Sequence, residues 1–290
     1  MINLINFIIK IIKRKLITWH YNSVKYKNKN SLSPYLKYND NITDIWYTTQ
    51  GYERHINSTI DYYTKKGSQD FFIDVGANIG LTTISNWKKF HNIYCFEPNG
   101  LVFNILKTNV AMSCDKEKVK LFNVGLGLKA GKYILKVPKH NFGGAFIQEN
   151  NLQYSHISNQ SIENHIDVHV DIESKDFLNK NIFNKFKAEH KGIIKIDVEG
   201  YELQVLELIL STINVDKIVV IFENWESIDR KVIEKILKNN NFTSFKIGYI
   251  KWLNSFTQKI KFKSNYSNII FLDDSENYLP KECEIILEIG

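Results

Sequence analysis

Short apolar runs separated by helix-like segments make up most of this chain. Five of the runs are almost continuously hydrophobic, which is typical of parallel strands covered on both faces. They lie at residues 71–75, 93–96, 119–124, 193–198 and 218–222. Segments with helical spacing of apolar residues lie at 52–66, 79–90, 100–112, 201–211 and 228–240. This alternation predicts a doubly wound, mostly parallel α/β sheet.

Two later apolar runs, at residues 243–249 and 269–272, predict an antiparallel pair that closes a seven-stranded sheet. Between residues 128 and 190 the periodicity weakens, with a hairpin near 133–138, a break at Gly143-Gly144 and a polar stretch to about 166. Such a long interruption is typical of a lid or a substrate-binding insertion. We therefore expect an N-terminal extension over 1–50 and one α/β domain over 51–290, with an insertion or lid at about 128–190.

The N-terminal extension holds much of the positive charge of the 290-residue chain, which has 38 lysines and arginines, 31 acidic residues and a net charge of +7. Ile5, Ile8, Ile12 and Leu16 recur at helical spacing beside basic residues, which predicts a basic amphipathic helix over residues 1–16. Such a helix could lie on an anionic membrane, or it could dock on its own domain or on a partner. The apolar stretch is shorter than the roughly 20 residues of a membrane span.

The cysteines bear on the cellular compartment. Cys95, Cys114 and Cys283 are widely spaced and form neither a disulfide framework nor a zinc-ligand pattern, which fits a reducing compartment. The N-terminal charges follow the apolar run, unlike the order in a secretory signal. We therefore expect a cytoplasmic protein, with peripheral contact at the inner membrane face if residues 1–16 bind lipid.

A glycine-rich segment follows the first predicted strand and opens a predicted helix. It reads Asp74-Val75-Gly76-Ala77-Asn78-Ile79-Gly80. Glycines allow a cofactor to approach the backbone, and N–H groups at a helix start can bind a carboxylate or phosphate. The segment is not a full G-x-G-x-x-G and has no P-loop lysine. It indicates a nucleoside cofactor without identifying one.

Acidic residues follow two of the predicted strands. Glu97 lies about 20 residues after the glycines, where an acid can accept both ribose hydroxyls of NAD or S-adenosylmethionine. The stretch IIKIDVEGYE, residues 193–202, then places Asp197 and Glu199 at the carboxyl end of a buried strand. Methyl transfer to a hydroxyl needs a base there, and either residue could serve. Asp197 could instead be a helix N-cap.

A magnesium ion held by Asp197, Glu199 and Glu223 is an alternative, because hard oxygen ligands suit that ion. The spacing of these residues shows no dedicated cage. We therefore expect catalysis without a metal.

Five motifs in this order, DVGANIG, FEPN, VGLG, IKIDVEGYELQVL and IFEN, lie within a stretch from about residue 52 to 225. Together they resemble the FkbM family of methyltransferases, and Tyr52-Glu53 resembles the family's entry helix. The resemblance implies a Rossmann-like class I methyltransferase fold and S-adenosylmethionine as the methyl donor. It also implies an oxygen acceptor, commonly on a sugar, a glycan or a small metabolite.

The resemblance also implies roles for individual residues. Four residues of the glycine-rich segment would surround the methionine end of the cofactor, with Glu97 on its ribose and Asn99 as a weaker contact. Asp197 and Glu199 would be catalytic and face the methyl group, and Glu202 and Glu223 would border the acceptor. The four residues at the methionine end are Asp74, Gly76, Asn78 and Gly80.

Three other functions compete with this interpretation. The positive charge and scattered aromatics suggest a nucleic-acid (ribose 2'-O) methyltransferase, but no N-P-P-Y tetrapeptide and no RNA-binding module is present. A NAD-dependent oxidoreductase would carry the three-glycine fingerprint. A catalytically inactive nucleotide-binding module would be expected to lose Gly76, Glu97 or Asp197, and all three are present. We therefore expect a small-molecule or glycan acceptor rather than nucleic acid.

Overall fold

An eight-stranded sheet forms the centre of the fold. In the computed structural model its strands lie in the order β11-β10-β12-β9-β8-β1-β2-β3. Five neighbouring strands pair in parallel: β9 (Lys217–Asn224), β8 (Lys191–Ile196), β1 (Phe71–Val75), β2 (Asn92–Phe96) and β3 (Val119–Phe122). The other three pair antiparallel: β12 (Cys283–Ile289), β10 (Phe245–Lys251) and β11 (Ile269–Leu272). The predicted doubly wound α/β fold is confirmed.

The structure describes residues 52–139, 141–147, 164–224, 245–251, 269–272 and 283–289, together with residues 15, 34–36, 40, 42, 43, 46 and 235. The helices predicted over 1–16 and 228–240 lie outside these ranges, apart from Lys15 and Lys235. Within the described ranges, no helix combines the length and hydropathy needed to cross a membrane. Contact of residues 1–16 with an anionic membrane stays a prediction.

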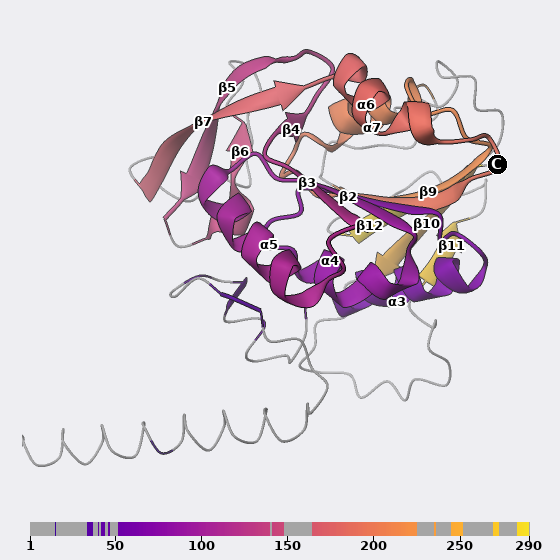
Figure 1. The fold of residues 1–290 in the computed structure, drawn as a ribbon, viewed down its shortest axis with the longest axis horizontal. Coiled ribbons are helices and arrows are strands. Elements are labelled where there is room, and N and C mark those ends of the chain that lie inside the picture. Colours follow the sequence, from indigo (N-terminus) through magenta and orange to yellow (C-terminus); the bar gives the residue numbers. More distant parts are fainter. Residues whose placement is uncertain are drawn as a thin grey trace, which may run out of the picture.

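Helices cover both faces of the main sheet. In Figure 1, α6 (Lys175–Asn181) and α7 (Glu202–Leu210) lie on one face, and α3 (Arg54–Lys65), α4 (Leu81–Asn86) and α5 (Gly100–Ser113) lie on the other. Side chains alternate between the two layers along each strand: Phe71 and Ile73 pack in the α6/α7 cluster, whereas Phe72 packs in the α3/α4/α5 cluster. This double burial explains the continuous apolar runs in the sequence.

Two charged residues interrupt the apolar interior of the sheet. Asp74 of β1 and Lys195 of β8 are register partners, with 1% and 5% of their surface exposed. By the strand alternation they lie on the same face as Phe72 and Ile193, beneath α3 and α4. The centre of the sheet is therefore polar on the α3/α4 face alone.

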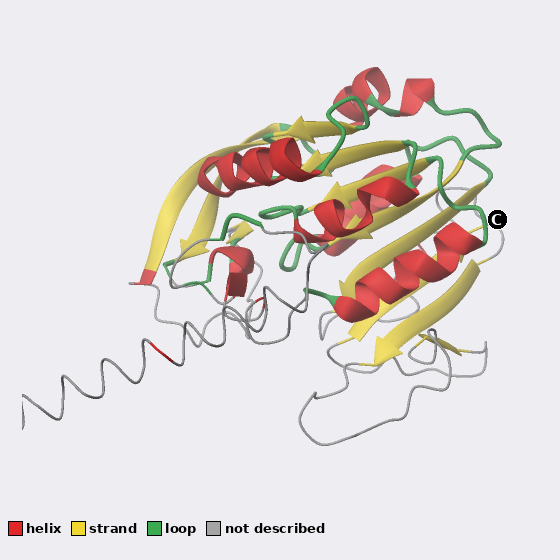
Figure 2. Cartoon of the chain, turned by 60° about the horizontal axis from the view of Figure 1, so that its bottom comes forward, coloured by secondary structure: helices red, strands yellow, loops and turns green. Residues whose placement is uncertain are grey.

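A second, four-stranded sheet follows β3 in the chain and is visible at the end of the molecule where α5 begins (Figures 1 and 2). Its order is β4-β7-β5-β6, from β4 (Gly125–Leu126), β7 (His165–Glu173), β5 (Gly131–Pro138) and β6 (Phe146–Ile147). Leu135 and Val170 of this sheet belong to the same buried cluster as Phe71. The region expected as an insertion or lid thus shares the main core, and its movement as a lid stays a prediction.

The structure corrects the predicted strands in two places. The described residues hold eight strands in the main sheet rather than seven, because β12 inserts antiparallel between β9 and β10. The strand expected over 119–124 ends at Phe122, since the chain then leaves the main sheet to pair Gly125 with Ile172. The predicted antiparallel pairing of 243–249 with 269–272 is confirmed.

Leu106 on α5 tests the packing of the α3/α4/α5 layer, because its side chain is fully buried. We expect Leu106→Ala to lower the free energy of unfolding by about 2–5 kcal/mol, through lost burial and a residual cavity. The exposed neighbour provides a matched control: Lys107→Ala should change that free energy by less than about 0.5 kcal/mol. Urea unfolding of both variants measures the difference, and equal effects would contradict this packing.

Candidate active site

A cavity of about 250 Å³ lies at the carboxyl ends of β1, β2 and β8. Residues 76–79, 97–98 and 197–199 supply its polar wall from the loops that follow these strands. The second sheet and the adjoining turn η2 (Phe142–Gly144) supply apolar wall residues: Leu126, Leu135, Phe142, Ala145, Ile147 and Ile172. Open α/β sheets bind ligands at this edge.

Backbone strain concentrates around this cavity. The non-glycine residues with positive φ in the described ranges are Glu53 (44°), Asn78 (50°) and Glu199 (51°). Asn78 and Glu199 line the cavity, and Glu53 pairs with a third lining residue, Lys195. A left-handed backbone conformation at a non-glycine residue is strained and persists only where the surrounding contacts hold it in place. Such residues cluster at functional sites.

Gly76 allows two of the cavity loops to touch. Its φ is 79°, and a Cβ placed on it would lie 1.8 Å from the carbonyl oxygen of Asp197. The Asp197 N–H donates to the Val75 carbonyl at 3.0 Å. Gly80, with a φ of 84°, similarly leaves room for Leu106, whose Cδ1 would be 2.5 Å from an added Cβ. Both glycines therefore serve protein packing first, and their contact with a cofactor stays a prediction.

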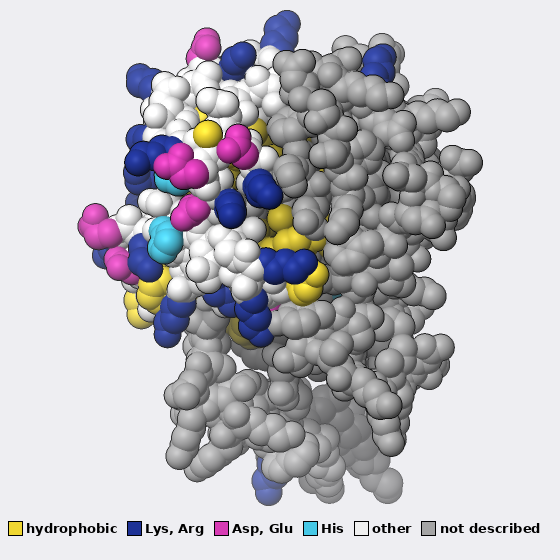
Figure 3. All heavy atoms as spheres, turned by 90° about the vertical axis from the view of Figure 1, so that its right-hand side faces the viewer, with side chains coloured by type: hydrophobic (Ala, Val, Ile, Leu, Met, Phe, Trp, Pro, Cys, Tyr) yellow, Lys and Arg dark blue, Asp and Glu magenta, His cyan; other side chains and the backbone are white. Residues whose placement is uncertain are grey.

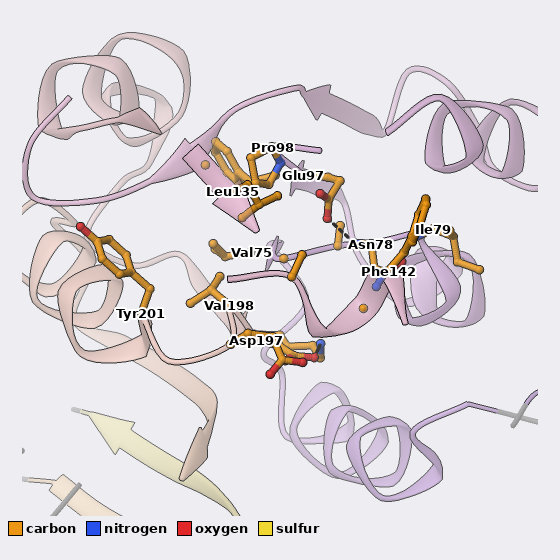
Figure 4. Close-up of a pocket in the computed structure, with 18 of the residues that line it drawn as sticks. Val75, Asn78, Ile79, Glu97, Pro98, Leu135, Phe142, Asp197, Val198 and Tyr201 are labelled. Carbon is orange, nitrogen blue, oxygen red and sulfur yellow. Dashed lines mark hydrogen bonds and ion pairs between the residues drawn. The ribbon is translucent and has the colours of Figure 1, made fainter. Parts of the chain in front are cut away.

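Glu97 is a buried and rigidly held carboxyl group. Its Oε2 accepts from the Asn78 N–H at 3.0 Å, the bond dashed in Figure 4, and its Oε1 accepts from the Asn99 N–H at 2.8 Å. Burial raises the pKa of Glu97 to about 7, although both of these hydrogen bonds lower it. The predicted ribose-binding acid thus lies in the cavity wall, joined to the glycine-rich loop.

Two other predicted cofactor residues lie behind the wall rather than in it. Asp74 accepts a 2.6 Å hydrogen bond from the Thr83 hydroxyl, and burial raises the pKa of Asp74. The Asn99 side chain caps α5 by accepting from the Leu101 N–H at 3.1 Å. Neither side chain is among those that line the cavity. Both hold the loops that form it.

Asp197 lies in the cavity wall as predicted, with an unexpected partner. Its Oδ2 is 2.8 Å from Nζ of Lys195, which is also 3.5 Å from Oε1 of Glu53. Burial alone would lower the pKa of Lys195, but Asp197 and Glu53 raise it well above its usual value. Sequence reasoning missed Lys195, although a lysine within the buried run 193–196 was the available signal.

Among the remaining predicted acids, Glu199 also lines the cavity. Burial, with Asp197 and Glu202, raises its pKa well above the usual value for a carboxyl group. Glu202 does not line the cavity: its Oε1 accepts from the N–H groups of Val198 and Gly200 at 3.2 and 3.1 Å. Glu202 therefore holds the β8–α7 loop together. Tyr201 is the N-cap of α7, which corrects the alternative that Asp197 is this cap.

Glu223, predicted to border the acceptor, lies on β9 opposite Glu284 of β12 and is not among the cavity-lining residues. It therefore does not join Asp197 and Glu199 in the wall. The described residues contain no group of three or more His, Cys, Asp and Glu side chains arranged to hold a metal ion.

Residues 74–244 match the methyltransferase FkbM domain, and this is more than half of the chain. The chain belongs to the FkbM methyltransferase family. Methyltransferase sdnD from Sordaria araneosa is 28% identical over 185 residues, which cover 58% of this chain and 66% of that protein, just under two thirds. The eight-stranded sheet and the family match together identify a class I methyltransferase fold.

Solved structures with similar folds include a precorrin-6y C5,15-methyltransferase from Geobacter metallireducens, with a TM-score of 0.37 and 10% identity over 82% of this chain and 88% of that one. Another is a putative rRNA methylase from Clostridium thermocellum, with a TM-score of 0.41 and 8% identity over 81% and 94% of the two chains. Nothing about the activity of this chain follows from similarities at this level.

The contact at Gly76 can be tested against a second glycine. Gly67 also has positive φ (98°), but an added Cβ would meet nothing within 4 Å. We expect Gly76→Ala to lower the free energy of unfolding by at least about 2 kcal/mol more than Gly67→Ala, because it adds a steric overlap to the same conformational strain. Urea unfolding compares the two, and equal losses would contradict the close approach of the loops.

Glu202 gives a prediction for pH. Burial raises its pKa to about 7 in the folded protein, so its protonated form adds stability at low pH that is lost as the pH rises toward 7. Glu202→Gln keeps an oxygen for both N–H groups and removes the titration. From pH 5 to pH 8, the wild type should lose roughly 2–3 kcal/mol of unfolding free energy relative to this variant. A pH-independent difference in urea unfolding would contradict the assignment.

Proposed function

We propose that this protein transfers a methyl group from S-adenosylmethionine to an oxygen of a sugar, a glycan or a small metabolite. The observation that carries the proposal is the buried Glu97 carboxyl group, held by two backbone N–H groups at the edge of a cavity whose far wall bears Asp197 and Glu199. Membership of the FkbM family supports methyl transfer as the reaction.

The residues of the cavity fit this cofactor. A carboxylate has about four lone-pair positions, so each Glu97 oxygen can accept a ribose hydroxyl besides its present backbone donor. Ile79 and Pro98 flank Glu97 in the cavity wall and offer apolar surface for a base. Asn78 and Gly76 would contact the cofactor from the β1–α4 loop. When bound, S-adenosylmethionine supplies a methyl group on a sulfonium, ready for displacement.

The two acids near the end of β8 suit different tasks. Asp197 is paired with Lys195 at 2.8 Å, which fixes its position. Burial, with Asp197 and Glu202, raises the pKa of Glu199 well above the usual value for a carboxyl group, so its carboxylate form is a stronger base than an ordinary carboxylate. We assign Glu199 as the base. Glu199 would take the proton of the acceptor hydroxyl as that oxygen bonds to the methyl carbon, and the cofactor would leave as S-adenosylhomocysteine.

The charge of the cavity supports a neutral acceptor over nucleic acid. Lys195 is the one cation among the described residues that line the cavity, and Asp197 and Glu53 already pair with it. A phosphate chain there would meet carboxylates. On the side of the molecule away from the second sheet, drawn in Figure 3, the described lysines are interspersed with acidic side chains.

Calorimetric titration with S-adenosylhomocysteine tests the cofactor site. We expect micromolar binding by the wild type, no binding of NAD, and affinity at least about tenfold weaker in Glu97→Gln, because hydrogen bonds to a charged acceptor are lost. Glu117→Gln, at an exposed position outside the cavity, is the control and should bind like the wild type. Wild-type protein that binds NAD, or neither compound, would reject the proposed function.

A further inference from the structure

A lysine in the interior of the sheet joins the cavity wall to the segment that precedes α3. Lys195 is 5% exposed, and its Nζ contacts Asp197 in the loop after β8 and Glu53 immediately before α3. A buried ammonium group is stable only when paired, and these carboxylates come from segments more than 140 positions apart in the sequence. Lys195 therefore bridges the start of the domain to its central strand.

Glu53 is itself held on both sides. Its other oxygen, Oε2, accepts from the Thr82 hydroxyl at the start of α4 at 2.7 Å. Its backbone is left-handed, and its carbonyl accepts from the Asn57 N–H at 3.0 Å in the first turn of α3. The side chain is 15% exposed. Glu53 is thus fixed by α3, α4 and β8 together.

The residue before Glu53 faces the cavity. Tyr52 lines it together with Thr82, Lys195 and Asp197. Burial and the adjacent Glu53 raise the pKa of Tyr52 well above its usual value, so this phenol stays protonated. Tyr52 lies before the stretch 74–244 that matches the FkbM domain, yet it forms part of the cavity lining.

We propose that Lys195 and Glu53 are positioning residues that hold Asp197 and Tyr52 in place as one wall of the cofactor cavity. The inference rests on the proposed function, since it takes this cavity as the site of the nucleoside cofactor. Neither residue needs to touch the cofactor. Their effect on binding would pass through Asp197 and Tyr52, which a shift of the entry segment would displace.

If the Lys195–Glu53 pair only stabilises the fold, variants that regain stability should also regain binding; if it positions the cavity wall, they should not. Removing one partner of a buried pair leaves an uncompensated charge and destabilises the fold, whereas neutralising both partners is often tolerated. Asp197, with 28% of its side chain exposed, can be solvated from the cavity when Lys195 is absent. The double variant Glu53→Gln/Lys195→Met should therefore recover the stability that Lys195→Met loses.

The experiment compares stability with affinity for S-adenosylhomocysteine. We expect Lys195→Met and Glu53→Gln each to weaken binding at least about tenfold. The double variant should unfold at the urea midpoint of the wild type but still bind at least about tenfold more weakly than the wild type. The ion pair Lys136–Asp167, 2.7 Å long and outside the cavity lining, provides the control. Lys136→Met/Asp167→Asn should bind within twofold of the wild type.

Each outcome decides a different point. A double variant that binds within twofold of the wild type would overturn the inference, because the pair would then be structural alone. If the double variant does not fold, the single variant Glu53→Gln provides the test, because it keeps an oxygen for Thr82 and leaves the Lys195–Asp197 pair intact. Affinity of this single variant within twofold of the wild type would overturn the inference. Wild-type protein that does not bind would instead refute the proposed function, and the inference with it.

Discussion

The site depends on one contact between two backbones, where the loop after β1 meets the loop after β8. Gly76 has no Cβ, so the Asp197 carbonyl can occupy the space that a side chain would fill. The Asp197 N–H then extends the parallel pairing by bonding to Val75. With these two loops fixed at one edge, Glu97, which follows β2, accepts a hydrogen bond from the Asn78 N–H. Three strand ends thus form one polar rim.

The two faces of the main sheet have different chemistry because of where this rim lies. On the α6/α7 face, Ile194 and Ile196 continue an apolar core up to the cavity. On the α3/α4 face, Asp74 and Lys195 stand in neighbouring strands, and Glu53 closes the group from outside. Lys195 lies in the central strand β8, and its ion pair with Glu53 connects this strand to the segment that precedes α3 and β1. The contacts of Lys195 thereby connect the start of the domain to Asp197 in the cavity wall.

Local patterns were enough to predict the parallel strands and the place of Glu97, because double burial and strand-end acids depend on short stretches of sequence. The Lys195–Glu53 pair could not be predicted in this way, since it depends on a contact between distant segments. The loop contacts of Glu202 could not be predicted either, because an acid after a strand can face a ligand or bind its own loop, and only the geometry distinguishes these. β12 was missed because its run Cys-Glu-Ile-Ile-Leu-Glu-Ile mixes charges into the apolar pattern.

The second sheet shares its buried cluster with the main sheet, and this has a consequence for how the cavity can change in evolution. Leu135 and Ile147 line the cavity and also belong to the core that contains Phe71 and Leu206. A wall that had its own separate core could be replaced as a unit during evolution without changing the packing of the main sheet. Here a new cavity shape must instead come from individual substitutions, each of which also alters the packing beneath α7. Divergence of the cavity shape along this wall is therefore constrained by folding stability.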